Sequence, residues 1–184
     1  MNGWVRRSAS ALLAVLSGSA LAHPVDEVVQ GAYLFLAPGE VRLQLELAPG
    51  AQVAGQVVGA LDPNADGEVT DGEARAFAEG VLEQSTLTLD GTVAAWSLKS
   101  IDVPDLEMIR TGNTVLTIAA TAIRPEEAVR RHELTYENRY EPTETLWMAN
   151  IFVQPASDWR YVVTSQERSW DGSRLTVTFE VAEP

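Results

Sequence analysis

The sequence contains no cysteine. Disulfide bonds, thiolate metal ligands and thiol catalysis are therefore excluded, whatever the compartment in which the protein folds. Stability must come from a hydrophobic core instead, and a chain of 184 residues is long enough to bury one in a single domain.

Basic residues are also scarce. The chain has 13 Lys and Arg residues against 26 Asp and Glu residues, and its formal net charge is −13. An acidic surface repels the phosphates of nucleic acids and of anionic lipids. We therefore expect no nucleic-acid partner and regard a divalent cation as a natural ligand. Acidity also serves solubility alone, and the composition does not separate these two explanations.

Long apolar runs are missing too, because no window reaches the ~20 apolar residues that a membrane helix requires. A shorter pattern near the start is typical of a secretory signal: Arg6 and Arg7 precede the apolar run 11–16, and Ala20-Leu21-Ala22 resembles a cleavage site. We predict a signal peptide at 1–22, a mature chain that begins at His23, no membrane span after cleavage, and a periplasmic or secreted location. Cleavage removes two bases, so that 11 bases face 26 acids and the net charge becomes −15.

Most of the mature sequence has the pattern of short strands separated by turns. The runs Val28–Ala37 and Glu40–Ala48 flank Pro38-Gly39, and apolar and polar residues alternate in the second run, which predicts a hairpin. Roughly eight or nine strands predict a mainly β fold, a β-sandwich that is α+β overall and forms one domain over 23–184. The further strands are expected at 86–89, 93–103, 113–123, 133–140, 147–154, 159–166 and 174–181, with turns at Asp90-Gly91 and Asp171-Gly172.

A different pattern interrupts the strands at about residues 50–83. Apolar residues recur at helical spacing over 51–61 and again over 71–82, which predicts two short helices. A hard cation takes about six to eight oxygen ligands and needs a loop that keeps turning inward, and Gly67 permits such a bend. The residues between the helices that can supply oxygen ligands at suitable spacing are Asp62, Asn64, Asp66, Glu68, Thr70 and Glu73.

The segment 62–73 resembles the loop of the EF-hand calcium-binding family at every specified position, and the flanking helices extend the resemblance to about 30 residues. The resemblance implies one Ca²⁺, held by side-chain oxygens of Asp62, Asn64 and Asp66, by the carbonyl of Glu68, by Thr70 directly or through water, and by both carboxylate oxygens of Glu73. EF-hands usually occur in pairs, and the sequence has no second loop of this kind. A lone exported site favours a structural role and an affinity of about 10⁻⁴ M. The alternative is an Asp- and Gly-rich turn that simply joins two helices.

Three weaker patterns leave other functions open. His23 at the new amino terminus could chelate copper together with His132, although Arg130 and Arg131 make that neighbourhood positive. The mature sequence that opens with residues 23–28 is also faintly similar, over about 25 residues, to the extracytoplasmic part of HupE/UreJ-like nickel and cobalt permeases, which implies at most an accessory domain of a metal-transport system. A third group of residues could form a sugar-stacking platform or simply pack in the core: Tyr33, Trp96, Tyr136, Tyr140, Trp147, Trp159, Tyr161 and Trp170.

Motifs for catalysis are missing from the sequence. It has no Gly-x-Ser-x-Gly, no His-Glu-x-x-His and no glycine-rich phosphate loop. The acid pairs Glu126 with Glu127 and Glu141 with Glu144 are more typical of solvated loops. We predict an exported, non-enzymatic protein that binds Ca²⁺. The alternatives are a calcium-shaped module that binds a carbohydrate or a partner protein, and an accessory domain for metal transport.

Overall fold

The structure is a computed structural model that describes residues 25–124, 131–154 and 160–182. The predicted signal peptide and His23 lie outside these ranges. The described strands run over Val28–Ala37 (β1), Glu40–Pro49 (β2), Ser85–Leu89 (β3), Thr92–Ala94 (β4), Ser97–Asp102 (β5), Leu116–Ile123 (β6), Arg131–Asn138 (β7), Thr145–Val153 (β8), Arg160–Arg168 (β9) and Arg174–Ala182 (β10).

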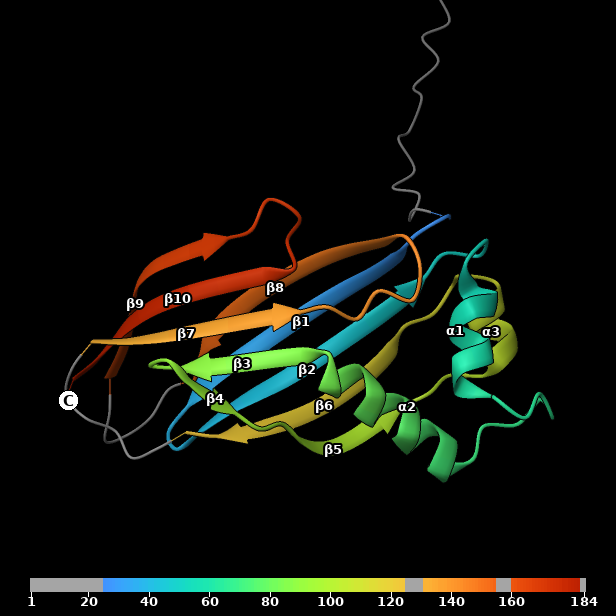
Figure 1. Cartoon of the computed structure of the whole chain (residues 1–184), viewed down its shortest axis with the longest axis horizontal. Helices are drawn as coiled ribbons and strands as arrows, with labels where there is room; N and C mark the ends of the chain where they lie inside the picture. Colours follow the sequence, from blue (N-terminus) through green and yellow to red (C-terminus); the bar gives the residue numbers. More distant parts are fainter. Residues whose placement is uncertain (1–24, 125–130, 155–159, 183–184) are drawn as a thin grey trace, which may run out of the picture.

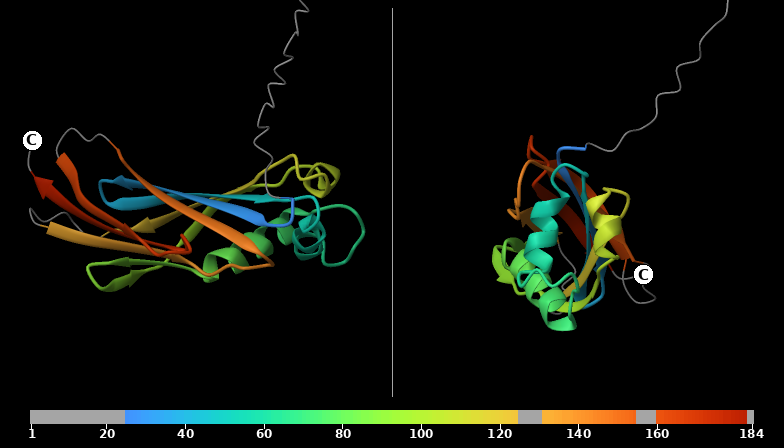
Figure 2. Two further views of the ribbon diagram at one scale, coloured as in Figure 1. Left: turned by 90° about the horizontal axis from the view of Figure 1, so that it is seen from above. Right: turned by 90° about the vertical axis from the view of Figure 1, so that its right-hand side faces the viewer.

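These strands form two sheets of five strands each, with the orders β5-β6-β2-β1-β8 and β4-β3-β7-β10-β9. Figure 1 shows the two sheets, and the view from above in Figure 2 shows them as two layers. Buried apolar side chains from both layers and from the helices belong to one hydrophobic core. The mainly β, sandwich-like fold expected from the alternating pattern is therefore confirmed.

The first hairpin shows how the pattern specifies the core. In β2 the side chains of Val41, Leu43, Leu45 and Leu47 are buried, and the residues between them are half-exposed. β1 and β2 pair antiparallel around Gly39, whose φ of 72° lies in the left-handed region that glycine adopts without a steric penalty. β1 also pairs in parallel with β8, more than 100 residues further along the chain, which local patterning did not predict.

The prediction of one strand over 93–103 is wrong. The chain passes from one sheet to the other at Ala95 and Trp96, so that β4 pairs with β3 while β5 pairs with β6. The change of sheet suits Trp96, whose ring packs edge-on against Tyr136 in the core at a centroid distance of 6.4 Å. A second irregularity follows within β5, where the register with β6 shifts between Leu98 and Ser100.

The part of the chain that the structure describes has three helices, which lie at one end of the sandwich (Figures 1 and 2): Ala54–Leu61 (α1), Asp71–Glu83 (α2) and Leu106–Arg110 (α3). The first two come between β2 and β3, so the predicted helix–loop–helix insert at about 50–83 is present. The sequence pattern did not indicate α3, which begins with the carboxylate of Asp105 accepting the backbone N–H of Glu107 at 2.8 Å. None of the helices within the described ranges is long and apolar enough to span a membrane.

A buried polar network joins the two sheets next to the helices. Asn138 of β7 donates its amide N–H to Oε1 of Gln30 in β1 at 2.8 Å, and Gln30 donates to the carbonyl of Tyr140 at 2.7 Å. Burial raises the pKa of Tyr140 to about 12, and its ring packs edge-on against Phe77 of α2 at 6.0 Å. The network therefore connects both sheets to the helical insert.

Candidate metal centre

The loop between α1 and α2 is bounded on one side by a well-formed helix start. Thr70 is the N-cap of α2, and its hydroxyl oxygen accepts the backbone N–H of Glu73 at 3.2 Å. The Glu73 carboxylate returns the contact, because its Oε2 accepts the backbone N–H of Thr70 at 2.9 Å and the Thr70 hydroxyl at 2.7 Å. This reciprocal capping box satisfies N–H groups that a helix start leaves without partners.

On the other side, Asp62 follows directly after α1 and fixes the turn of the loop. Its side chain is 5% exposed, and its two carboxylate oxygens accept the backbone N–H groups of Asp66 at 3.2 Å and Gly67 at 3.0 Å. Asn64 also binds Asp66, because its Oδ1 accepts the N–H of Asp66 at 2.9 Å and its Nδ2 donates to Asp66 Oδ2 at 2.9 Å. Asp62, Asn64 and Asp66 are thus brought together by their own hydrogen bonds.

The backbone of the loop turns sharply at two positions. Gly67 has a φ of 88°, which agrees with the bend assigned to this glycine from the sequence. Ala65 also has a positive φ, of 56°, which costs an alanine about 1 kcal/mol or more and persists only where neighbouring contacts impose it. The contacts around Asp62 and Asp66 provide that constraint.

The predicted ligands do not all converge in this structure. Asp62, Asn64 and Asp66 form one group, whereas Glu73 and Thr70 form another at the start of α2, and Glu68 takes part through its backbone N–H, which Asp66 accepts at 2.9 Å. Within residues 25–124, 131–154 and 160–182, no group of three or more His, Asp or Glu side chains is arranged as a metal site. Glu73 must exchange its contacts with Thr70 if it is to contribute both carboxylate oxygens to an ion.

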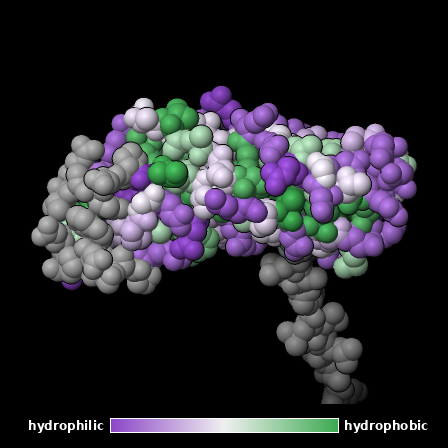
Figure 3. Space-filling view, turned by 90° about the horizontal axis from the view of Figure 1, so that it is seen from below, coloured by the Kyte–Doolittle hydropathy of each residue, from purple (hydrophilic) through white to green (hydrophobic). Residues whose placement is uncertain are grey.

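The residues nevertheless fit a calcium ion in kind. All of the available donors are carboxylate, amide, hydroxyl or carbonyl oxygens, which suit a hard cation and not a thiophilic one. The loop is also accessible, since Asn64, Asp66 and Glu68 are exposed. In Figure 3, the end of the molecule that carries the helices in Figure 1 is mostly hydrophilic. An ion bound here would supply positive charge to the ligand carboxylates of Asp62, Asp66 and Glu73, three of the five carboxylates in the segment 62–73.

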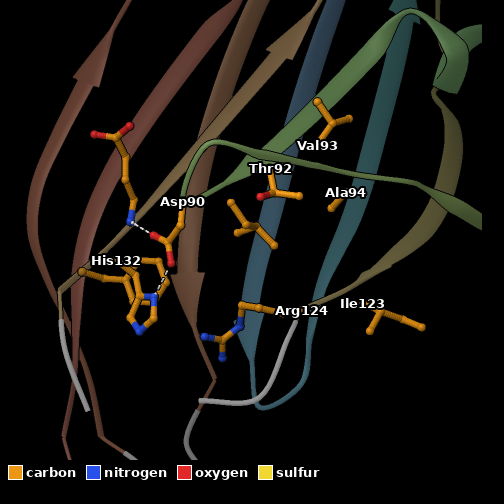
Figure 4. A pocket seen from close by; sticks show the side chains of 10 residues that line it. Asp90, Thr92, Val93, Ala94, Ile123, Arg124 and His132 are labelled. Carbon is orange, nitrogen blue, oxygen red and sulfur yellow. Dashed lines mark hydrogen bonds and ion pairs between the residues drawn. The ribbon is translucent and has the colours of Figure 1, made fainter. Parts of the chain in front are cut away.

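A second candidate site lies at the other end of the sheets and was not anticipated from the sequence. A pocket of about 380 Å³ is lined by polar and apolar side chains, and Figure 4 shows Asp90 and His132 pointing toward each other in it. His132 Nδ1 is 2.7 Å from Asp90 Oδ2, and the other Asp90 oxygen accepts the N–H of Glu133 at 2.9 Å. The imidazole ring stacks on Phe179 with a centroid distance of 5.4 Å.

The pocket also contains a buried basic group. Arg124 is 6% exposed, and its Nη2 donates to the carbonyl of Ala37 at 3.0 Å and to the hydroxyl of Tyr161 at 3.1 Å. The guanidinium lies over the rings of Tyr161 and Phe179, at 5.2 and 5.7 Å from their centroids. Such hydrogen bonds and cation–π contacts hold a charged group at the end of a sheet. They account for Arg124 as a structural residue of the pocket.

An Asp–His pair can also orient a histidine as a general base. Thr92 provides a hydroxyl among the described lining residues, but no hydrogen bond joins it to His132. The sequence could have signalled the pair only through Asp90 at the predicted turn, because the pairing of β3 with β7 that brings His132 beside it is not a local property.

The other sequence candidates are dispersed. Tyr136 and Tyr161 are buried in the core, whereas Trp170 is 98% exposed and stands apart from the core. Packing in the core, the alternative to a sugar-stacking platform, therefore applies to Tyr136 and Tyr161. Trp159, His23 and the pair Glu126 and Glu127 lie outside the described residues. Glu141 and Glu144 are exposed, in agreement with a solvated loop.

Comparison with known proteins assigns no family to the chain. No protein-family model matches it, and no curated protein is significantly similar to it. The resemblance of residues 62–73 to the EF-hand loop, and the fainter one of residues 23–28 to HupE/UreJ-like permeases, therefore stay predictions.

Proposed function

We propose that the protein binds one Ca²⁺ ion in the loop 62–73, and that this ion has a structural and not a catalytic role. The residues that would hold the ion are those predicted from the sequence: Asp62, Asn64, Asp66, Glu68, Thr70 and Glu73. The observation that carries the proposal is the network of Asp62, Asn64 and Asp66, in which a loop with two positive φ angles gathers oxygen donors at one place.

The physical effect of the ion follows from charge. Carboxylates held close together repel each other, and a divalent cation turns that repulsion into attraction. The loop connects α1 and α2, whose buried residues Val57, Leu61, Phe77 and Val81 pack into the core of the sandwich. Binding would therefore order the loop and stabilise the packing of both helices, and it would do so outside the cell or in the periplasm, where an exported chain meets ambient calcium.

We propose no enzymatic activity for the protein. The Asp90 and His132 pair is held by the N–H of Glu133 and by stacking on Phe179, contacts that are sufficient for a structural pair at the end of a sheet. The proposal for calcium does not depend on this pocket, which lies at the opposite end of the sandwich.

Isothermal titration calorimetry on the mature chain tests the proposal. Calcium should bind with a stoichiometry of about one, at a dissociation constant of about 10⁻⁴ M. Glu73→Gln removes one ligand charge and is expected to weaken binding at least about tenfold, or 1.4 kcal/mol. Glu83→Gln is the matched control, because Glu83 is exposed at the other end of α2. No heat of binding, or equal affinity in Glu73→Gln and the wild type, would refute the proposal.

A second candidate function is a calcium-shaped module that binds a partner protein. The observation that favours it is a set of exposed apolar side chains on β8, namely Leu146, Met148, Phe152 and Val153. Phe152 stacks on Phe35 at 5.3 Å and 23°, so each ring covers a face of the other, which suits a protein surface better than a sugar. A pull-down from periplasmic extract with and without calcium, repeated with Met148→Glu, tests it. Capture of the same proteins by both baits would contradict this function.

A further inference from the structure

A cleft of about 520 Å³ separates the loop 62–73 from the segment that joins β5 to α3. One wall is formed by the second half of the loop and the start of α2, and the other wall by residues 101–106. Figure 1 shows β5 ending beside α2. The candidate metal loop therefore faces a part of the chain that lies well beyond it in the sequence.

Val69 is the residue through which the loop meets the body of the protein. Residues 63–68 and 70 are all exposed, whereas Val69 is half-buried and packs against the hydrophobic core. Ile101 and Val103, on the other wall of the cleft, also pack against this core. The packing of Val69 against the core fixes the position of the second half of the loop, where the neighbouring residues 66–68 and 70 are exposed.

The opposite wall is held rigidly. Ile101 pairs with Ile118 of β6, a residue with no exposed surface, and α3 follows with Leu106 and Ile109 buried. Behind it, Gly112 has a φ of 70° and approaches the backbone of Ala51 so closely that a Cβ atom would lie 2.7 Å from its nitrogen. The wall is therefore anchored to β6 at one end, and the segment after α3 packs closely against the start of the helical insert.

We infer that the segment Ile101–Val103 is the support against which Val69 holds the loop for metal binding, so that Val69 and Ile101 are positioning residues of the calcium site although neither supplies a ligand. This inference rests on the proposed function. A loop that is already held loses less conformational freedom when its oxygens gather around an ion, and a released loop must be ordered at the expense of affinity.

Calorimetry with calcium on the mature chain tests the inference through matched apolar substitutions. Val69→Ala and Ile101→Ala are each expected to weaken calcium binding about tenfold, which corresponds to 1.4 kcal/mol. Val69→Ile keeps a branched apolar side chain at this position and is expected to stay within about twofold of the wild type. Val93→Ala, at a position that is 68% exposed on β4, is the control for the same chemical change away from the cleft.

A spectroscopic measurement separates positioning from a general loss of stability. Terbium(III) in place of calcium reports its number of bound waters through its luminescence lifetimes in H₂O and D₂O. A loosened loop in Val69→Ala should admit more water to the ion, whereas Val93→Ala should leave the lifetimes unchanged. Circular dichroism in EDTA checks that each variant folds. If Val69→Ala or Ile101→Ala does not fold, Ile101→Val serves instead, with an expected loss of about threefold.

The outcomes distinguish this inference from the proposed function. A wild-type chain that binds no calcium would overturn both. If the wild type binds calcium, and Val69→Ala and Ile101→Ala have the same calcium affinity and the same number of terbium-bound waters as the wild type, only the supporting role of the 101–103 segment is overturned. Weaker binding in Val69→Ala and Ile101→Ala, with rescue in Val69→Ile and no effect of Val93→Ala, would support it.

Discussion

Replacement of Asn138 by alanine should destabilise the protein more than any other single polar substitution that we consider. Asn138 is 2% exposed and is the centre of the network between the sheets. Its amide donates to Gln30 Oε1 at 2.8 Å, and its Oδ1 accepts the N–H of Tyr140 at 3.0 Å. A third contact, from the hydroxyl of Ser85 at 3.4 Å, is long and contributes little.

The magnitude follows from the groups that Asn138→Ala leaves without a partner. Each buried donor or acceptor that loses its hydrogen bond costs about 1–3 kcal/mol. Two such groups, Gln30 Oε1 and the Tyr140 N–H, give an expected loss of about 3 kcal/mol, or about 6–12 °C in melting temperature for a domain of this size. Asn113→Ala is the control, since Asn113 is exposed and its loss should stay within about 0.5 kcal/mol.

Urea unfolding followed by tryptophan fluorescence measures both variants. A double-mutant cycle with Gln30→Ala isolates the contact between Asn138 and Gln30, for which a coupling of about 0.5–3 kcal/mol is expected. If Asn138→Ala and Asn113→Ala had the same free energy of unfolding, the network would not join the sheets energetically. An absence of coupling in the cycle would likewise refute the reasoning.

Four further predictions concern the helices and the loop at one end of the sandwich. Calcium at a hundredfold excess over its dissociation constant should stabilise the protein by ~2.7 kcal/mol, or about 5–11 °C in a melting scan against EDTA; an unchanged curve would contradict the proposed site. Thr70→Ala removes the capping box and should cost about 1 kcal/mol in urea unfolding, whereas Thr70→Ser should retain it. Gly112→Ala should cost at least about 2 kcal/mol from its φ of 70° and the approach to Ala51. At Gly80 in α2, an added Cβ would meet nothing within 4 Å. Gly80→Ala should therefore raise the free energy of unfolding, measured in urea, by up to about 1 kcal/mol.

Features that depend on neighbours in the sequence could be predicted. The hairpin of β1 and β2, the turns at Asp90-Gly91 and Asp171-Gly172, and the two helices around the loop all follow from local periodicity and turn chemistry. The glycines at these turns have the positive φ angles that the turns require, 72° at Gly39 and 80° at both Gly91 and Gly172. Local energetics and tertiary packing agree at these places.

The error at 93–103 had a signal in the sequence. Apolar residues at Val93 and Trp96 are three apart, which breaks the period of two, and the same slip recurs between Leu98 and Ile101. The first slip coincides with the passage from β4 to β5, and the second with the register shift between Leu98 and Ser100. A change in the phase of alternation indicates a bulge or a change of sheet.

Two other features could not be predicted from local pattern. The parallel pairing of β1 with β8 joins Val28 to Thr145, and the pairing of β3 with β7 places His132 beside Asp90. Both depend on which strands become neighbours in the folded sheets, and side-chain alternation carries no information about the identity of a partner strand. The pocket of Asp90, Arg124 and His132 is a product of topology.

The candidate calcium site combines a predictable part with an unpredictable one. Residue types and spacing predict Asp62, Asn64 and Asp66 as calcium ligands, and the hydrogen bonds within this group bring the three side chains together. Glu73 has two competing roles, because the carboxylate that would close the site also completes the capping box with Thr70. A capping contact is worth about 1 kcal/mol, and a bound dication must exceed this to take the carboxylate. Under the proposed function, part of the free energy of calcium binding is therefore needed to break the contact between Glu73 and Thr70. Thr70→Ala removes a calcium ligand, but it also removes the hydroxyl that competes for Glu73, and the second effect should partly offset the first. For that reason Thr70→Ala should weaken calcium binding less than Glu73→Gln does in the same titration.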